Sequence, residues 1–219
     1  MTLEVIVLAL GSAPRPAGMA ALYALLSAPH PRRVLVAHVA AGFCFSVAFG
    51  VAVVAFLHGT DLRHQDGVVN SLIQLLAGVA ALGYSVGVGT GRARPPSHNE
   101  SAQESAVTRR LHNPSVGTAA AAGVATHLPG LFYLVALNSI VSSGDDFAAG
   151  VAGVLLFNVI WFGAAIASVV IFLIRPGAAR RALGRTSAWA QRNARATTIV
   201  VFAVVGVYLT LNGAIGLAG

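Results

Sequence analysis

The feature that most constrains this chain is a series of long apolar stretches separated by short polar ones. A helix that crosses the hydrocarbon core of a bilayer needs about 20 mostly apolar residues. Six stretches satisfy that length: residues 3–26, 34–57, 68–90, 116–141, 147–174 and 197–217. Only 10% of the 219 residues are charged and 56% are hydrophobic, which excludes an ordinary soluble domain. The sequence therefore predicts an all-α polytopic membrane protein with six transmembrane helices.

The first stretch resembles a signal peptide only in its position. It opens with Glu4 and carries no basic residue ahead of its apolar part. We therefore expect it to be retained as a transmembrane segment.

The arginines predict the orientation in the membrane. Twelve of the 14 basic residues, all arginine, fall in the polar segments 27–33, 91–115 and 175–195. The two remaining loops together hold one arginine and four aspartates. Cytoplasmic loops carry the excess of arginine and lysine. We therefore expect a multi-pass protein of the cell membrane, with these three segments in the cytoplasm and both termini outside.

The long polar segment 91–115 divides the chain into two halves of three spans. Because three is odd, the second half must insert upside down relative to the first, which is the inverted-repeat plan of many transporters. We expect a first three-helix repeat over residues 1–90, a cytoplasmic linker over 91–115 and a second three-helix repeat over 116–219.

The first helix of each half is interrupted at an equivalent place. "GSAPRPAG" interrupts the first span and "GVATHLPG" the fourth, so that Pro16 corresponds to Pro129 and Pro14 to His127. Each proline removes a backbone donor and breaks the helix near the middle of the membrane. Such a break is tolerated only where protein or a water-filled cavity covers it.

New half-helices are expected to begin at Pro16 and Pro129, with Ser12 and Thr126 near enough to bond freed backbone groups. The positive end of each half-helix dipole then points to the midplane. The two breaks therefore predict an anion-binding site there.

Arg15 lies inside the first break, where burying its charge costs about 3 kcal/mol on translocon scales. The only acid within a predicted span is Glu4, eleven residues away, or about 16 Å along a straight helix. An arriving anion such as phosphate, sulfate or carboxylate is the expected partner. The alternatives are bonds to carbonyls exposed at the break, or a bend that brings Arg15 to Glu4.

Four further polar residues lie within or near the spans. His127 is a second candidate donor to the anion or a buried, hydrogen-bonded histidine. Asn158 is a candidate ligand or a helix-to-helix hydrogen bond. His38 is expected at the cytoplasmic interface. Cys44, the only cysteine, is expected in the core and excludes a disulfide within the chain.

Two surface patterns have alternative interpretations. One is a glycine face at four-residue spacing, which serves either packing within the monomer or a homodimer contact: Gly83, Gly87 and Gly91. The other predicts an amphipathic helix on anionic headgroups, or else is plain topogenic charge: Arg181, Arg185, Trp189 and Arg192.

The opening segment "LEVIVLALGSAPRPAGMAALYALLSAPHPRRVLVAHVAAG" resembles the Sap/GAP family of actinobacterial sulfolipid-addressing and peptidoglycolipid-addressing membrane proteins. A weaker resemblance surrounds "ATHLPG". The resemblance implies membership of the lysine-exporter superfamily, with three-plus-three inverted repeats whose first and fourth helices are broken. It also implies a role in exporting cell-envelope glycolipids alongside a larger lipid exporter, but it supplies no substrate-binding residues.

We expect a transporter that binds the headgroup of an anionic lipid or glycolipid at the midplane. The candidate site residues are Ser12, Pro14, Arg15, Pro16, Thr126, His127, Pro129 and Asn158. The alternatives are an exporter of small solutes such as amino acids, and a non-transporting scaffold for a lipid-export complex. We expect no enzymatic activity, no metal, no cofactor and no nucleic-acid partner, since the spans lack clustered ligands, a catalytic constellation and a phosphate-binding glycine loop.

Overall fold

The structure is a computed structural model that describes residues 2–12, 16–26, 28–58, 67–93, 114–143 and 146–218. The regular elements in these ranges are all helices. They are α1 (Thr2–Ser12), α2 (Pro16–Leu25), α3 (Pro31–His58), α4 (Gly67–Gly89), α7 (Val116–Thr126), α8 (Leu131–Ser142), α9 (Phe147–Trp161), α10 (Gly163–Ile174), α11 (Pro176–Arg192) and α12 (Ala194–Ala218). A helix bonds its own backbone groups, which is what a bilayer demands of a spanning segment.

Three helices are long and apolar enough to cross a membrane alone, namely α3, α4 and α12. The number rises to five if two bent pairs, α7 with α8 and α9 with α10, are each one span. The first pair bends by 69° and the second by 58°. The remaining predicted span contains α1 and α2, and the residues between them lie outside the described ranges. The architecture is thus that of an all-helical protein with several membrane-spanning candidates.

The break in the second pair is one that the sequence interpretation missed. Residues 147–174 were expected as one uninterrupted span, and the structure bends them at Phe162, directly before Gly163. Phe162 keeps its own backbone bonds, to Asn158 on one side and Ile166 on the other, both 2.8 Å. Glycine is a common kink position, so the bend here needs no proline.

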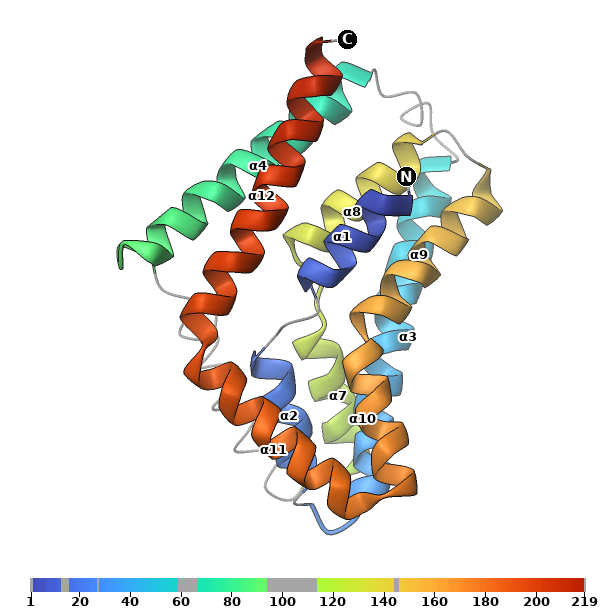
Figure 1. The fold of residues 1–219 in the computed structure, drawn as a ribbon. Helices are drawn as coiled ribbons and strands as arrows, with labels where there is room; N and C mark the ends of the chain where they lie inside the picture. The colour runs from blue at the N-terminus through green and yellow to red at the C-terminus, as the bar shows by residue number, and fades with distance from the viewer. Residues whose placement is uncertain are drawn as a thin grey trace.

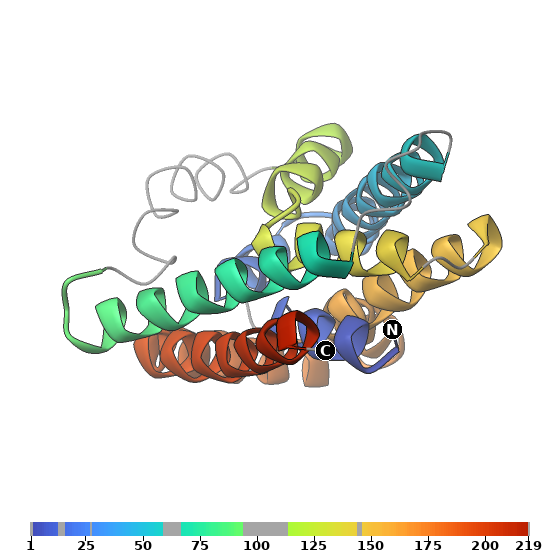
Figure 2. The same ribbon diagram turned by 90° about the horizontal axis from the view of Figure 1, so that it is seen from above.

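The helices form an elongated bundle with both chain ends at the same end (Figure 1). α4 and α12 run side by side along one flank, and α3 packs against α7 and α9 on the other. The view from above shows the same pairing of α4 with α12 (Figure 2). α1 packs against α8 and α9 between these flanks. α11 lies across the end of the bundle opposite to the termini.

α4 and α12 approach each other through glycine. A Cβ atom on Gly78 would lie 2.5 Å from the backbone nitrogen of Thr210 and 2.9 Å from the carbonyl oxygen of Gly206. One on Gly213 would lie 2.6 Å from the backbone nitrogen of Leu75. Small residues permit this backbone-to-backbone approach of membrane helices.

The glycines of the predicted face, Gly83, Gly87 and Gly91, are different ones, and the described residues do not show the alternative of packing within the monomer. A Cβ at Gly83 or Gly91 would meet no atom within 4 Å among the described residues, and one at Gly87 would meet only Ala93, just beyond the same helix. Residues four positions apart share a face on any side of a helix. The spacing therefore does not indicate which face of α4 packs against α12. The homodimer alternative remains a prediction.

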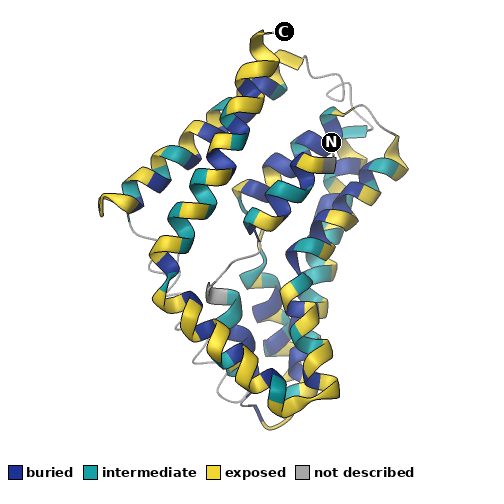
Figure 3. Ribbon diagram, viewed as in Figure 1, coloured by how far each residue is buried: buried dark blue, intermediate teal, exposed yellow. Residues whose placement is uncertain are grey.

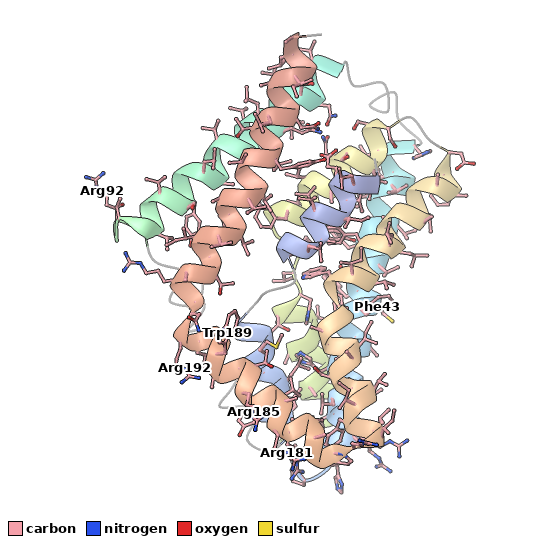
Figure 4. The ribbon with its side chains drawn as sticks, viewed as in Figure 1. Phe43, Arg92, Arg181, Arg185, Trp189 and Arg192 are labelled. Carbon is pink, nitrogen blue, oxygen red and sulfur yellow. The ribbon has the colours of Figure 1, made fainter. Side chains whose placement is uncertain are left out.

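α11 confirms that the last basic segment is helical. Its buried face consists of Ala179, Leu183, Ser187 and Ala190. This face packs on α2, where the ring of Tyr23 lies beside Gly184. Arg181, Arg185, Trp189 and Arg192 project from the helix (Figure 4). The apolar side of α11 is thus used at least partly against protein rather than lipid.

Exposed residues follow the outer faces of the long helices (Figure 3), and many of them are apolar. On α4 and α12 they include Leu76, Val86, Val204 and Ile215, each more than half exposed. Such surfaces are a liability in water and fit contact with lipid chains. Cys44 on α3 is also exposed, so its expected place in the core was wrong.

The glycine contacts lead to a prediction for two alanine variants on the same helix. Gly78→Ala should lower the free energy of unfolding in detergent by about 1–3 kcal/mol, because the backbone of α12 cannot yield to an added methyl group. Gly83→Ala adds the same methyl group where space is open and should be neutral or slightly stabilising. Equal midpoints of thermal unfolding for the two variants would contradict the α4–α12 contact.

Candidate binding site at the helix breaks

The helices that lead into the two predicted breaks end in the same way. α1 and α7 are both eleven residues long, and each ends on a hydroxyl residue, Ser12 or Thr126. Ser12 Oγ donates to the carbonyl of Leu8 at 2.9 Å, and Thr126 Oγ1 donates to that of Ala122 at 2.8 Å. Both hydroxyls therefore bond back into the helix they end.

The helices that follow the breaks begin at Pro16 and Leu131. Pro14 and Arg15 lie outside the described residues, as does the side chain of Pro16. Pro129 is part of the link between α7 and α8, two residues before the helix start rather than at it. Gly130 is the N-cap of α8 and offers no side-chain bond to the first turn. The leading backbone N–H groups of α8 therefore lack a side-chain cap.

A cavity of about 40 Å³ lies between these breaks. It is lined by residues from both halves of the chain: Gly18, Met19, Leu22, Thr126, His127, Trp161, Ala164 and Ala165. The first three come from α2, the next two from the end of α7, and the last three from the bend between α9 and α10. A cavity of this size has room for a few water molecules. Helix α2, the end of α7 and the bend between α9 and α10 thus meet at one partly polar space.

His127 is the central side chain of this site. Its ring stacks on Phe162, with centroids 4.3 Å apart, and meets the ring of Trp161 edge-on at 5.7 Å. Its Nδ1 lies 2.9 Å from the carbonyl oxygen of Gly123. A carbonyl only accepts, so this contact favours a proton on Nδ1. The aromatic stack and the hydrogen bond fix the ring at the wall of the cavity.

A second histidine, His38, packs against the ring of His127. His38 of α3 is fully buried, so its expected place at the membrane interface was wrong. Its Nδ1 bonds to the carbonyl of Ala119 at 3.2 Å, and its ring lies 5.8 Å from that of His127. Gly123 permits this arrangement, because a Cβ there would lie 2.8 Å from the backbone carbon of His38. The sequence alone does not reveal that α7 packs over His38.

Asn158 lies near the cavity without lining it. It is fully buried, and its Nδ2 donates to Val154 O at 2.9 Å and to Tyr133 Oη at 3.2 Å. The Tyr133 hydroxyl in turn donates to the carbonyl of Ser46 at 2.7 Å. Asn158 thus links α9 to α8 and, through Tyr133, to α3. Of the two uses predicted for this residue, the structure shows the helix-to-helix bond.

The site contains no obvious metal centre within the described part of the chain. No group of three or more histidine, cysteine or acidic residues gathers there in a way that could hold an ion. The polar side chains that line the cavity are instead a hydroxyl, an imidazole and an indole. With its Nδ1 proton directed to Gly123, a neutral His127 has Nε2 as a hydrogen-bond acceptor, whereas an indole N–H is a donor.

The sequence matches the family model of Sap, the sulfolipid-1-addressing protein, over residues 5–215. The chain belongs to the Sap family. This match runs from within α1 to within α12 and confirms the family resemblance that the opening segment indicated. No curated protein and no solved structure shows significant similarity to the chain.

The Sap-family chain also contains a buried polar cluster that sequence reasoning missed. Glu4 of α1 accepts hydrogen bonds from Gln74 of α4 and Ser139 of α8, at 2.9 and 2.7 Å. Gln74 accepts a further bond from Asn212 of α12 at 2.7 Å. Polar residues inside four separate apolar stretches were the available signal, but the sequence offered no means of pairing them.

The Tyr133 link leads to a prediction about stability. Tyr133→Phe leaves the donor of Asn158 and the carbonyl of Ser46 each without one bond, which should cost about 1–3 kcal/mol of unfolding free energy. Tyr23→Phe on α2 removes a hydroxyl from a side chain that is 46% exposed, and should change little. Chemical unfolding in detergent measures both variants. A Tyr133→Phe protein as stable as the Tyr23→Phe protein would show that the link carries no stability.

Proposed function

We propose that this Sap-family protein translocates an anionic lipid or glycolipid of the cell envelope across the membrane. The observation that carries the proposal is a partly polar cavity lined by the end of α7 at its break from α8, by the bend between α9 and α10, and by α2. Broken backbone at membrane depth is confined to places where it is buried in protein or lines a cavity, and in transporters such places bind substrate. The family's name, sulfolipid-1-addressing protein, supports an anionic lipid as the substrate class.

In this proposal the chain has six spans in two inverted repeats, with α1 and α2 together forming the first. The helix order supports it. α1, α2, α3 and α4 match α7, α8, the α9–α10 pair and α12, with 11 residues in both first helices and 28 residues from Pro31 to His58 and from Phe147 to Ile174. The matched helices also run in opposite directions along the bundle (Figure 1). α11 is then an addition to the second half.

The proposed orientation places α11 on the cytoplasmic side and both termini outside. α11 supplies Arg180, Arg181, Arg185 and Arg192 at the end of the bundle opposite to the termini. The arginine excess on cytoplasmic loops supports this assignment. Anionic headgroups of the inner leaflet would then face the arginines of α11.

Arg15 is the proposed anchor for the headgroup. It directly precedes Pro16, the first residue of α2, and α2 supplies Gly18, Met19 and Leu22 to the cavity. A guanidinium binds a sulfate or phosphate through two parallel hydrogen bonds. The uncapped first turn of α8 would add backbone donors from the opposite half.

The cavity is far too small for a glycolipid headgroup, so the structure corresponds to a closed state in this mechanism. Binding requires the helices on either side of the breaks to separate. Alternating exposure of the two halves would then carry the headgroup past the midplane while the lipid tails stay in the bilayer. A larger lipid-export protein and a second copy of the chain are the partners that this mechanism accommodates.

The first test is native mass spectrometry of the protein purified with its own lipids. The wild type and Arg33→Ala, a neighbouring exposed arginine, should retain the same anionic lipid. Arg15→Ala should bind it about ten- to a hundredfold more weakly, because a charge-assisted bond contributes roughly 1.5–3 kcal/mol. Ala165→Leu, which fills the cavity without changing charge, should also lose the lipid.

A fluorescence titration separates the proposal from its alternatives. The chain has two tryptophans, so Trp189→Phe leaves Trp161 as a reporter in the cavity wall. A sulfated glycolipid in nanodiscs should change its emission, and a zwitterionic lipid should not. A response to free amino acids instead would favour a small-solute exporter. No response to any ligand, with identical lipids bound to Arg15→Ala and wild type, would favour a scaffold.

A further inference from the structure

A buried carboxylate lies outside the proposed lipid site and has no role in it. Glu4 is 7% exposed within a bundle whose outer surface is apolar. Its two oxygens accept from neutral donors, Gln74 and Ser139. No arginine or histidine of the described residues forms an ion pair with it. Burying a carboxylate among neutral groups is costly, and membrane proteins keep such residues mainly for function.

We propose that Glu4 is a proton-binding site, and that its protonation loosens the contact between α1 and α8. The site is independent of the headgroup anchor at Arg15, since none of its residues lines the cavity. The ligand is a proton, because the cluster supplies one carboxyl group and three neutral side chains rather than the set of acids and histidines that holds a divalent cation.

The hydrogen bonds around Glu4 can satisfy both of its protonation states. Asn212 donates to Gln74 Oε1, which fixes the amide so that its nitrogen faces Glu4 Oε1. The Ser139 hydroxyl is not fixed in this way. It donates to an ionised Glu4, and it can rotate to accept from a protonated one. A proton on Oε2 therefore reverses the bond with Ser139 and turns a charge-assisted bond between α1 and α8 into a weaker neutral one, while the bond from Gln74 stays.

The side chains that neighbouring helices present to Glu4 are neutral, so Glu4 is the member of the cluster that binds or releases the proton. α4 presents Gln74, α8 presents Ser139, and α9 has no ionisable residue. α12 presents the hydroxyl of Tyr208, which interacts electrostatically with Glu4, and the neutral Asn212. A positive charge that acts on Glu4 is that of the amino terminus, three residues earlier in the chain.

The position of Glu4 connects proton binding to the helix breaks. Its bond to Ser139 joins α1 to α8, and the far ends of both helices lie at the breaks. Ser12 is eight positions after Glu4, and Ser139 is eight positions after Leu131. The helical segment between Glu4 or Ser139 and the nearer break is therefore about 12 Å long in each case. Changing this one bond therefore acts on the two helix ends that flank the breaks.

Hydrogen exchange measured by mass spectrometry across a pH series tests the proposal on the full-length protein in nanodiscs. After correction for the intrinsic pH dependence of exchange, peptides from α1 and α8 should lose at least tenfold protection as the pH falls. Glu4→Gln, which has the shape of the protonated acid, should show the low-pH protection at every pH. Glu4→Asp keeps a carboxyl group and should keep the step. Asp146→Asn removes an exposed carboxylate that caps α9 and should behave as wild type.

Infrared spectra over the same pH series provide a readout that does not depend on helix movement. The band of a protonated, buried carboxyl group should appear on acidification in wild type, Glu4→Asp and Asp146→Asn, and be missing in Glu4→Gln. An unchanged band in Glu4→Gln would overturn proton binding. A band that is lost in Glu4→Gln, with exchange in α1 and α8 independent of pH in wild type, would overturn the coupling. Neither result depends on whether Arg15 binds lipid.

Discussion

The structure depends above all on the need to bond every backbone group away from water. Unbroken helices meet this need by themselves, and α3, α4 and α12 do so over 23 to 28 residues. The break between α7 and α8 and the bend between α9 and α10 do not. Thr126 bonds back into α7, which it ends, and the rings of His127, Trp161 and Phe162 pack on one another at the break and the bend. The cavity lies beside both interruptions.

Glycine residues permit the close helix packing that surrounds these interruptions. Gly123 brings the backbone of α7 against that of α3, which buries His38 behind His127. Gly78, Gly206 and Gly213 do the same for α4 and α12. Between these two tight pairs, α1 and α8 are held by side-chain bonds from Glu4 and by contact with their neighbours. The bundle therefore combines two rigid flanks with a centre joined by a few polar bonds.

The sequence predicted most of the helices because their signal is local. The long apolar runs place α3, α4 and α12 within three residues of their ends, and the prolines place the two breaks. The bend at Phe162 lacks such a signal, since one glycine is common in membrane helices. Contacts between helices join residues that are far apart in the sequence, so they have no local signal either. The exposure of Cys44, the burial of His38 and the bonding of Glu4 depend on which helix lies opposite, and hydropathy does not contain that information.

In the proposed inverted-repeat arrangement, α1 and α7 are equivalent first helices, but different contacts hold them, and this difference bears on mechanism. Towards the termini, the carboxyl group of Glu4 ties α1 to α8 through Ser139 and to α4 through Gln74. Towards α11, α7 is tied to α3 by backbone contact at Gly123 and by the bond from His38 to Ala119. A contact made through backbone opens only if whole helices move, whereas a contact through one ionisable side chain changes with a single proton. In an alternating mechanism the two ends would therefore open with different energies, and the end near the termini is the one that pH would control.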